Sequence, residues 1–283
     1  MRPRGHIGIM AKLAYLPERG VIDIGGADRI GFLQGLVSND VGRAAPGRCV
    51  WSALLTPQGR YRAEFFIFAT DDSLLLDVTR AAVPDIITRL SRFKLRSKVA
   101  LTDRSDDFAV HAGWDGADSE GLIAAPDPRL EGAGIRILAP TRLDGADGPE
   151  SYLAHRLALG LPDHADLEPD TTLLMEAGFD ELHGIDWEKG CYMGQELTAR
   201  TRYRGLVKRR LIPIDADADL LEHGTITAGD REAGDLRTHC GRRGLAMLRV
   251  DQLGQPLRLG DISITPVLPD WLKLPAPTEK APA

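Results

Sequence analysis

The sequence predicts an α+β protein that ends in a small β-barrel, and three observations support this prediction. Strand and helix patterns are mixed as far as about residue 160. Residues 162–187 are then rich in Asp, Glu and Pro, as in a long functional loop, with one apolar cluster at 172–175. Beyond residue 206 the chain contains short strand-like runs separated by Gly, Asp and Pro, a spacing that suits a second, all-β domain.

The elements before the loop begin with a strand at 21–24, which a glycine pair ends. From Ala27 onwards apolar residues recur at intervals of three and four, which predicts an amphipathic helix that stops at Asn39. Strand patterns at 49–55 and 61–69 flank the turn Thr-Pro-Gln-Gly and predict a β-hairpin. The other predicted elements are strands at 74–78, 99–101, 108–112, 135–138, 206–214, 225–227, 244–250 and 262–265, and helices at 81–90 and 151–159.

Composition narrows the class of protein. The chain has 283 residues, 43% of them apolar and 27% charged, which is ordinary for a soluble protein of two or three modules. The net charge of -6 gives no overall drive toward nucleic acid or an anionic membrane. No apolar run approaches the roughly twenty residues of a membrane span, and the basic start at 1–4 is not followed by a signal-type segment. We expect a soluble, cytoplasmic monomer.

Cysteine spacing excludes a cysteine-based structural metal site. The three cysteines, Cys49, Cys191 and Cys240, are far apart in the chain and form no CxxC pair, so we expect no metal centre. Cys49 and Cys240 are predicted to be structural, and Cys240 with the adjacent His239 is at best a weak metal candidate.

One eight-residue segment combines a thiol, a cation, two glycines and a carboxamide–carboxylate pair: Lys189-Gly190-Cys191-Tyr192-Met193-Gly194-Gln195-Glu196. The cation two residues before the cysteine, together with the arginines at 200–204, would favour a reactive thiolate. The glycines indicate a built turn. A lone cysteine is also common as a small buried hydrophobe, and composition alone favours that interpretation.

This motif, followed by Ala199-Arg200 and Arg204-Gly205, resembles the KGC-[FY]-x-GQE signature of YgfZ-type folate-binding proteins. Three other segments agree with that family in the same order: FLQGLVSNDV at 32–41, LTPQGR at 55–60 and LRSKV at 95–99. The resemblance extends from about residue 14 to about residue 267. Because four segments agree in order, we interpret Cys191 as a reactive thiol.

The wider superfamily is that of the glycine-cleavage T-protein, an aminomethyltransferase that uses tetrahydrofolate, and the resemblance implies its fold. Residues 8–204 would form a T-protein-like folate-binding domain of two mixed α/β subdomains around a central channel. Residues 205–270 would form a small C-terminal β-barrel and residues 271–283 a flexible tail, in which 275–283 are low in bulky apolar side chains.

The resemblance implies a tetrahydrofolate-binding accessory protein for the assembly or repair of iron–sulfur clusters in client enzymes. Its partners would be folate and iron–sulfur client or assembly proteins. The reactive group would be Cys191, with Lys189, Glu196 and Arg200 beside it. The residues expected to contact folate are Glu176, Glu64, Asn39, Tyr192 and Arg204.

Two carboxylates are central to the folate prediction. Glu176 lies in a segment that resembles the L-x-L-E-A-G of T-proteins, where the glutamate contacts the pterin, and a carboxylate can accept two N–H groups. T-proteins also carry an aspartate pair after the hairpin glycine, where this chain has Ala63 and Glu64. Strand alternation groups residues 61, 63 and 65 on one face, so a surface pair of Glu64 with Arg62 is the alternative.

The sequence leaves open the role of two basic stretches and allows three other functions. Residues 93–99 are basic and could be a solvated strand edge. The cations between 200 and 210 could attract the glutamate tail of folate or an acidic partner, or could also be a solvated strand edge. The main alternative function is a folate-dependent aminomethyl transferase, which the loss of the aspartate pair puts in doubt. An interaction module without ligand is a third possibility, and nucleic-acid binding is the weakest.

Overall fold

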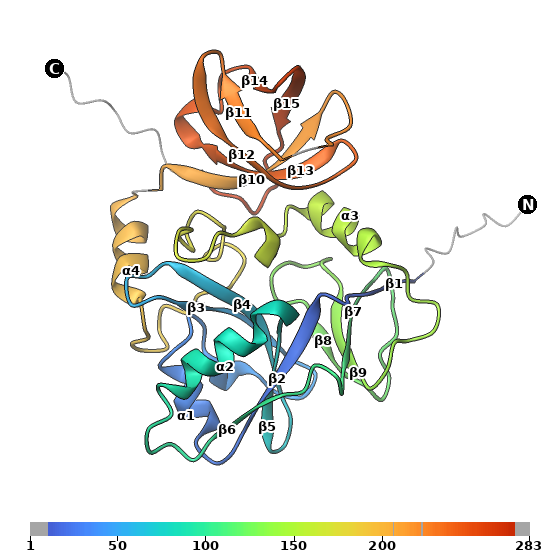
Figure 1. The fold of residues 1–283 in the computed structure, drawn as a ribbon, viewed down its shortest axis with the longest axis vertical. Helices are drawn as coiled ribbons and strands as arrows, with labels where there is room; N and C mark the ends of the chain where they lie inside the picture. Colours follow the sequence, from blue (N-terminus) through green and yellow to red (C-terminus); the bar gives the residue numbers. More distant parts are fainter. Residues whose placement is uncertain (1–10, 206, 222, 275–283) are drawn as a thin grey trace, which may run out of the picture.

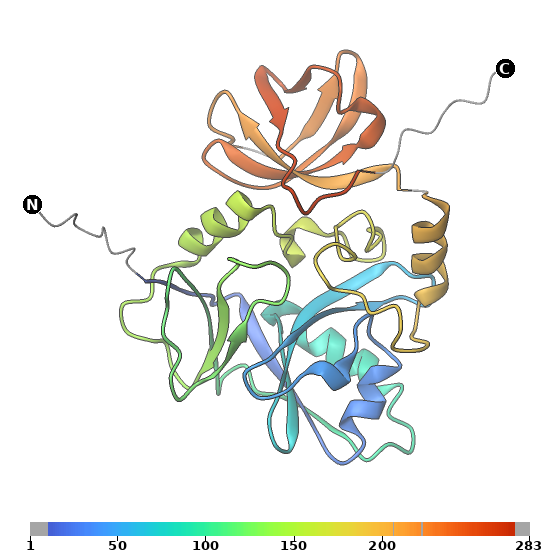
Figure 2. The ribbon, with the colours of Figure 1, turned by 180° about the vertical axis from the view of Figure 1, so that it is seen from behind.

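The computed structural model describes residues 11–205, 207–221 and 223–274. It contains two antiparallel sheets and a closed barrel. Figures 1 and 2 show the barrel at one end of the molecule, with α3 and residues 160–185 between it and the two sheets. The basic start at 1–4, Leu206 of the first predicted barrel strand and the last nine residues of the predicted tail lie outside the described residues.

A five-stranded antiparallel sheet forms the larger subdomain, with the strand order β3-β4-β5-β2-β6. Helices α1 and α2 bury apolar side chains on one face of it. Helix α1 ends at Gln34 and not at Asn39 as predicted, because Leu36 and Val37, which continue the apolar spacing, reach the same core from the chain beyond the helix. The predicted hairpin is confirmed, because β3 and β4 pair along their length. The elements are β2 (Arg19–Gly25), α1 (Arg29–Gln34), β3 (Val50–Leu55), β4 (Tyr61–Ala69), β5 (Ser73–Thr79), α2 (Val83–Ser91) and β6 (Ala100–Asp103).

A four-stranded antiparallel sheet, in the order β1-β7-β9-β8, forms the second subdomain. Helix α3 follows it and ends at Gly160, whose φ of 72° only glycine adopts without strain. The elements are β1 (Lys12–Tyr15), β7 (Ala109–Trp114), β8 (Ile123–Pro126), β9 (Ile135–Ala139) and α3 (Pro149–Leu159). No helix of the described chain combines the length and the apolar character needed to cross a membrane.

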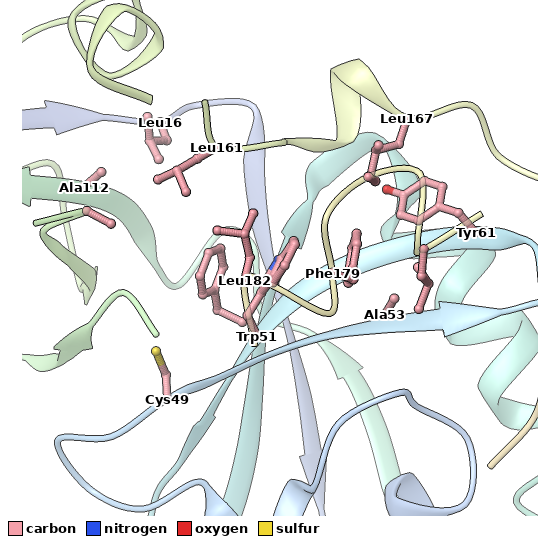
Figure 3. Close-up of a cluster of buried hydrophobic side chains, with 14 of the residues drawn as sticks. Leu16, Cys49, Trp51, Ala53, Tyr61, Ala112, Leu161, Leu167, Phe179 and Leu182 are labelled. Carbon is pink, nitrogen blue, oxygen red and sulfur yellow. The ribbon is translucent and has the colours of Figure 1, made fainter. Parts of the chain in front are cut away.

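The main core lies between the two sheets. Strand β4 alternates as a sheet buried on both sides requires, because Phe65 and Ile67 face the helices while Phe66 and Phe68 face the second sheet. In Figure 3, Trp51 of β3 and Phe179 of the long loop lie side by side within this core, and their ring centroids are 4.0 Å apart. The loop at 160–185 is therefore packed structure although it contains almost no regular elements.

The predicted face grouping at the start of β4 is wrong. The register of the β3–β4 pair shifts between Leu54 and Leu55, so Tyr61 lies in the same core as Phe66 rather than with Phe65. A β-bulge of this kind adds one residue and reverses the alternation on one side of it. The surface pair of Glu64 with Arg62 is not formed, because Glu64 is buried and Arg62 binds Asp85 and Asp170.

The C-terminal barrel closes in the order β10-β13-β12-β11-β14-β15 around its own apolar core. Strand β12 was not predicted, because within it only Ala233, Gly234 and Leu236 are buried and its other residues are polar or partly exposed. The strands are β10 (Arg209–Ala216), β11 (Thr225–Ala228), β12 (Arg231–Cys240), β13 (Arg243–Arg249), β14 (Leu257–Leu259) and β15 (Ile262–Pro266).

The segment after the barrel packs back onto the rest of the chain. Trp271 donates a hydrogen bond from Nε1 to the carbonyl of Leu159 at 3.0 Å, and Leu272 is buried. The prediction of a flexible tail that starts at residue 271 is therefore wrong for residues 271–274. Cys240 was also expected to be structural, but it is exposed on the barrel, whereas Cys49 is buried as predicted.

Candidate functional site

Cys191 is exposed on a loop that leads into α4 (Gln195–Arg204). We call residues 184–194 the thiol loop. Helix α4 was not predicted, because its sequence QELTARTRYR has no apolar stripe. Arg200, Arg202 and Arg204 therefore lie on a helix, so the strand-edge interpretation is wrong for them, while Arg209 and Arg210 do begin strand β10.

Two glycines bring the thiol loop against the β3–β4 turn. Gly194 has a φ of 82°, and a Cβ at this position would lie 2.6 Å from the carbonyl oxygen of Thr56. Gly59 has a φ of 74°, and a Cβ there would lie 2.7 Å from the carbonyl oxygen of Gly194. Both positions therefore require glycine for conformation and for close approach. This contact connects two of the segments on which the family resemblance rests.

Lys189 anchors the other side of the thiol loop. Its Nζ donates hydrogen bonds to the carbonyls of Gln34, Val37 and Asn39 at 2.7, 2.6 and 2.8 Å, and these groups follow or end helix α1. Burial lowers the pKa of Lys189 to about 8. The ammonium group was expected to face Cys191, but the structure directs it at backbone oxygens, because three carbonyls converge there. Lys189 is therefore a positioning residue for the loop.

Asp186 and Gln195 close the loop on itself. Asp186 Oδ1 accepts the backbone N–H groups of Glu188 and Lys189, both at 2.8 Å, and its Oδ2 lies 2.7 Å from Arg43. Gln195 Oε1 accepts the backbone N–H of Tyr192 at 3.3 Å. These side chains satisfy backbone donors that would otherwise point into solvent.

Tyr192 and the first turn of α4 complete the surroundings of the thiol. The Tyr192 ring is buried beneath the Lys189 ammonium, with 5.3 Å between Nζ and the ring centroid, and burial raises the pKa of this tyrosine to about 12. Glu196 and Arg200 form an exposed ion pair one helical turn apart, at 2.7 Å. Arg200 is thus neutralised by Glu196, and the described cations nearest in sequence to Cys191 both have other partners.

The predicted site residues are divided among three places. Lys189, Cys191, Tyr192, Glu196 and Arg200 lie on the thiol loop or the start of α4, and Arg204 is exposed at the end of that helix. Asn39 lies beneath the loop, where its amide donates to the carbonyls of Trp51 and His183 at 2.7 and 2.6 Å. Glu64 and Glu176 lie elsewhere.

Glu64 belongs to a buried ion network between the two sheets. Its Oε1 lies 2.5 Å from Arg19 Nη1, and its Oε2 accepts the indole N–H of Trp51 at 2.8 Å. Arg19 and Arg136 both bind Asp77, at 2.6 and 2.7 Å. These side chains and the Trp51–Phe179 pair occupy the space between the two sheets, where the resemblance places a channel. Each oxygen of Glu64 therefore has a partner within the core.

Glu176 lies where the barrel meets the rest of the chain. Its Oε2 accepts the backbone N–H of Leu173 at 3.0 Å, and its Oε1 lies 3.3 Å from Arg209 Nε. Its backbone carbonyl accepts the N–H of Leu211 of β10 at 2.8 Å. Both carboxylate oxygens are therefore engaged within the protein, so this residue joins the barrel to the long loop.

A carboxylate that the sequence analysis missed is Glu181. Its Oε1 binds Arg210 at 2.7 Å, whereas its buried Oε2 has no hydrogen-bond partner among the described residues. Glu181 also lines a hollow of about 490 Å³ together with Asp127, Arg129 and His183. An unpaired buried oxygen favours a ligand that supplies an N–H group. In the sequence, Glu181 is one acidic residue among many in a loop, so no pattern singled it out.

Comparisons with known proteins agree with the fold. The model of the CAF17 C-terminal β-barrel domain matches residues 208–274. The glycine cleavage system aminomethyltransferase T from Bartonella henselae has a similar structure, with a TM-score of 0.73 over 91% of this chain and 84% of that protein, at 12% identity. The predicted fold class, a T-protein-like α+β domain followed by a β-barrel, is therefore confirmed.

Sequence relatives provide the functional comparison. The mitochondrial iron–sulfur cluster assembly factor IBA57 homolog of Mycosarcoma maydis is 39% identical, over 72% of this chain and 57% of that protein. The Neurospora crassa homolog is 32% identical over 72% and 54%, and the mouse IBA57 protein 29% identical over 90% and 84%. Homologues of this chain are iron–sulfur cluster assembly factors.

The relatives differ in length from this chain, and the location in their names differs from the one predicted for it. The chain spans little more than half the length of the two fungal proteins. All three relatives are named as mitochondrial proteins, which contradicts the cytoplasmic location predicted from the sequence. The iron–sulfur part of the predicted function is supported, whereas the relation to YgfZ-type proteins stays a prediction.

Proposed function

We propose that this protein, like the YgfZ-type proteins that it resembles, assists the assembly or repair of iron–sulfur clusters, and that Cys191 is its reactive group. The strongest support for a reactive role of the thiol is the way in which the loop holds it at the surface. Cys191 is exposed, while the residues on both sides of it are held by Lys189 and by the Gly194 contact. A thiol held in a built loop at the surface is suited to meet a group on another protein.

The chemistry proposed for this thiol follows from the iron–sulfur cluster on which it would act. Thiolates are the ordinary ligands of iron in iron–sulfur clusters. The Cys191 sulfur can replace a thiolate of a donor protein at one iron of a cluster, and the displaced donor thiolate takes up the Cys191 proton. A client thiol can later replace Cys191 at the same iron in the same way, which returns a proton to Cys191. One cysteine provides one ligand, so the partner has to supply the others. This places the reaction between two proteins, with the cluster as cargo.

The first prediction concerns this thiol. Cells that lack the protein and are supplied with the Cys191→Ala variant should have the same low iron–sulfur enzyme activity as cells without the protein. The variant should fold normally, because exposed substitutions usually change stability by less than about 0.5 kcal/mol. The measurement is iron–sulfur enzyme activity in extracts, with thermal melting of the purified variant. Cys240→Ala removes another exposed thiol and serves as the matched control; full activity of Cys191→Ala would contradict the proposal.

We further propose that tetrahydrofolate binds to the domain formed by residues 8–204, as the T-protein-like fold suggests. The carboxylates nominated from the sequence do not fit as free acceptors, because Glu64 and Glu176 have partners on both oxygens. Glu181 fits better, since its buried Oε2 has no partner among the described residues and the residue lines a hollow, toward which a turn of the side chain would bring this oxygen. The aminopyrimidine edge of the pterin carries N–H groups that such an oxygen could accept.

The second prediction tests this site. Titration with tetrahydrofolate should raise the melting temperature of the wild-type protein, and Glu181→Gln should weaken binding about tenfold by removing a charge-assisted acceptor. Isothermal calorimetry provides the affinities. Glu168→Gln, a change at a half-exposed carboxylate of the same loop, is the control. Absence of a shift with reduced folates would remove the cofactor from the proposal and leave the thiol role untouched.

The geometry argues against aminomethyl transfer. The only acid–base nominee was Glu64, and both of its oxygens are engaged with Arg19 and Trp51 inside the core. A general acid or base has to reach the reacting group within hydrogen-bond distance. We therefore propose an accessory protein that acts on a partner, and we expect it to work as a monomer.

A further inference from the structure

The loop between α2 and β6 carries an unusual concentration of unpaired positive charge. We call residues 92–98 the basic loop. Its four cations are Arg92, Lys94, Arg96 and Lys98, and within the described chain none of them has an acidic side chain at ion-pair distance. The chain as a whole has a net charge of -6. A positive segment on an acidic protein provides local attraction for an acidic surface.

Apolar side chains are exposed within the same loop. The side chain of Leu95 is 91% exposed and that of Phe93 43%, and Ile30 on the neighbouring helix α1 is 45% exposed. The backbone of Leu95 has a φ of 37°, which non-glycine residues rarely adopt. An open hollow of about 690 Å³ lies beside these residues and is lined by Asp28, Phe93, Leu95, Arg96 and Ser97. Exposed apolar groups within a polar rim are typical of a protein-binding surface.

The basic loop and the thiol loop border the same short helix. At the start of α1, Asp28 accepts the backbone N–H of Lys98 at 2.7 Å. At its end, the carbonyls of Gln34 and Gly35 accept from Lys189 Nζ and the Met193 N–H, at 2.7 and 3.1 Å. Six helical residues span about 9 Å. Figure 1 shows the segment between α2 and β6 passing beside α1 at the lower left. One protein partner could therefore cover both loops.

We propose that the basic loop is the docking surface for the iron–sulfur client or assembly protein that meets Cys191. The location rests on the proposed function of that thiol. The partner has an acidic surface around an apolar depression that receives Leu95, while its cluster ligands face the thiol loop. An acidic protein accounts for both features of the loop, because it can pair with the cations and also bury Phe93 and Leu95. A nucleic acid fits less well, because its bases stack on aromatic rings and the most exposed apolar side chain of the loop is the aliphatic Leu95.

The experiment uses the full-length protein. A photo-cross-linking residue, p-benzoylphenylalanine, replaces Leu95, and the same residue at Leu221, which is 83% exposed on the barrel side, is the matched control. The protein captured in cells is identified and purified, and its affinity is measured by calorimetry at low and high salt. The variants are Leu95→Asp, Lys94→Glu with Arg96→Glu, Cys191→Ala and Leu221→Asp. Phosphatidylglycerol vesicles are a second probe.

If the basic loop is the docking surface, the photo-reactive residue in place of Leu95 should cross-link an iron–sulfur enzyme or assembly protein, and the one in place of Leu221 should not. Leu95→Asp and the charge-reversal variant should each raise Kd about tenfold or more, and the charge-reversal variant should lose most of the salt dependence. Leu221→Asp should bind as the wild type does. Equal cross-linking at both positions, an unchanged Kd for Leu95→Asp, or binding to vesicles in place of the purified partner would overturn the proposal.

Cys191→Ala separates this inference from the proposed function. If docking is by the basic loop, this variant keeps the wild-type Kd even though it no longer supports iron–sulfur enzymes. If instead Cys191→Ala supports those enzymes fully while Leu95→Asp loses its partner, the docking surface stands and the role of the thiol fails. Melting temperatures of all variants should match the wild type, since the changed side chains are exposed or, at Lys94, half-buried.

Discussion

The ammonium group of Lys189 binds backbone carbonyls in a segment about 150 residues earlier in the chain. Its three acceptors are carbonyls at the end of α1 and just beyond it, groups that an α-helix leaves without internal partners. A compact ammonium suits three converging oxygens better than a planar guanidinium would. The lysine of the motif therefore shapes the loop that presents Cys191, and the exposed thiol itself has no cation directed at it among the described side chains.

A half-buried charge pair contributes to the response of stability to pH. His164 Nδ1 lies 2.6 Å from Asp163 Oδ1, near Arg19. Burial opposes protonation of His164, but the hydrogen bond and charge of Asp163 outweigh it, so the net pKa of His164 is raised from its ordinary value of 6.5. The folded protein therefore holds this proton more tightly than the unfolded chain does. The resulting stabilisation is complete below about pH 6.5 and is lost as the pH rises through the folded pKa.

The third prediction follows from this pair. Between about pH 6.5 and pH 8, the free energy of unfolding of the wild type should decrease relative to that of His164→Gln as pH rises, because only the wild type loses the stabilisation of the His164 proton. Burial lowers the pKa of His111 and His155, and both histidines are present in both proteins, so the comparison isolates His164. Urea unfolding at several pH values measures the effect. His183→Gln, at an exposed histidine of the long loop, is the control. A His164→Gln slope equal to that of the wild type would show that the Asp163 contact does not hold the proton.

At the scale of elements, the contact between Gly59 and Gly194 connects the β3–β4 turn to the thiol loop. Both glycines have left-handed φ angles, and each would place a Cβ within 2.7 Å of a backbone oxygen of the other segment. Gly190, by contrast, has a φ of 92°, but a Cβ at its position would meet no other atom within 4 Å. Gly190 is therefore required for its backbone conformation alone, whereas Gly194 is required both for its conformation and for the close approach of Thr56.

The fourth prediction uses this difference. Gly190→Ala should destabilise the protein by about 1–2 kcal/mol, the cost of a left-handed alanine. Gly194→Ala should cost more, because the new methyl group also collides with the Thr56 carbonyl and displaces the loop. Hydrogen exchange of residues 184–194 and urea unfolding measure both effects. If both variants show equal exchange and stability, the close approach does not hold the loop in place.

The elements also show what can be predicted from sequence. The hairpin, α2 and the start of α1 have apolar spacing that matches their period, and α3 ends at the Gly160 stop signal, so the positions of these elements follow from the sequence pattern. Helix α4 and strand β12 do not, because their residues are mostly polar and tertiary contacts determine them. The thiol could be singled out from its motif. The partners of Glu64 and Lys189 could not, because they come from segments distant in the chain.

At the scale of the whole molecule, the barrel is fastened to the long loop and α3. The Trp271 ring packs so closely on Gly178 that a Cβ at this glycine would lie 2.9 Å from the ring. The indole N–H of Trp271 donates a hydrogen bond to the Leu159 carbonyl. Arg156 of α3 donates to Thr238 Oγ1 of β12 at 3.1 Å. Glu176, nominated as a folate ligand, also joins the two parts through Arg209. The barrel and the remainder should therefore unfold together.

The fifth prediction tests this coupling. Trp271→Ala should lower the free energy of unfolding by about 2–3 kcal/mol, somewhat less than for a fully buried tryptophan, and should separate barrel unfolding from that of the sheets. Urea denaturation followed by circular dichroism and by tryptophan fluorescence measures whether the two transitions still coincide. Leu268→Ala, at a side chain that is 50% exposed in the same segment, is the control. Coincident transitions of unchanged midpoint in Trp271→Ala would show that other contacts are sufficient.

The anchoring of Lys189 has a consequence for the order of events during folding. Its three acceptors lie 155, 152 and 150 residues earlier in the chain. Contacts of such long sequence separation form late, because a large loop has to close first. A newly made chain therefore has its cysteine before it has the geometry that presents it. Under the proposed function, the protein can therefore receive a cluster only after the thiol loop has docked on the end of α1, so a half-folded chain should not compete with the finished protein for a cluster.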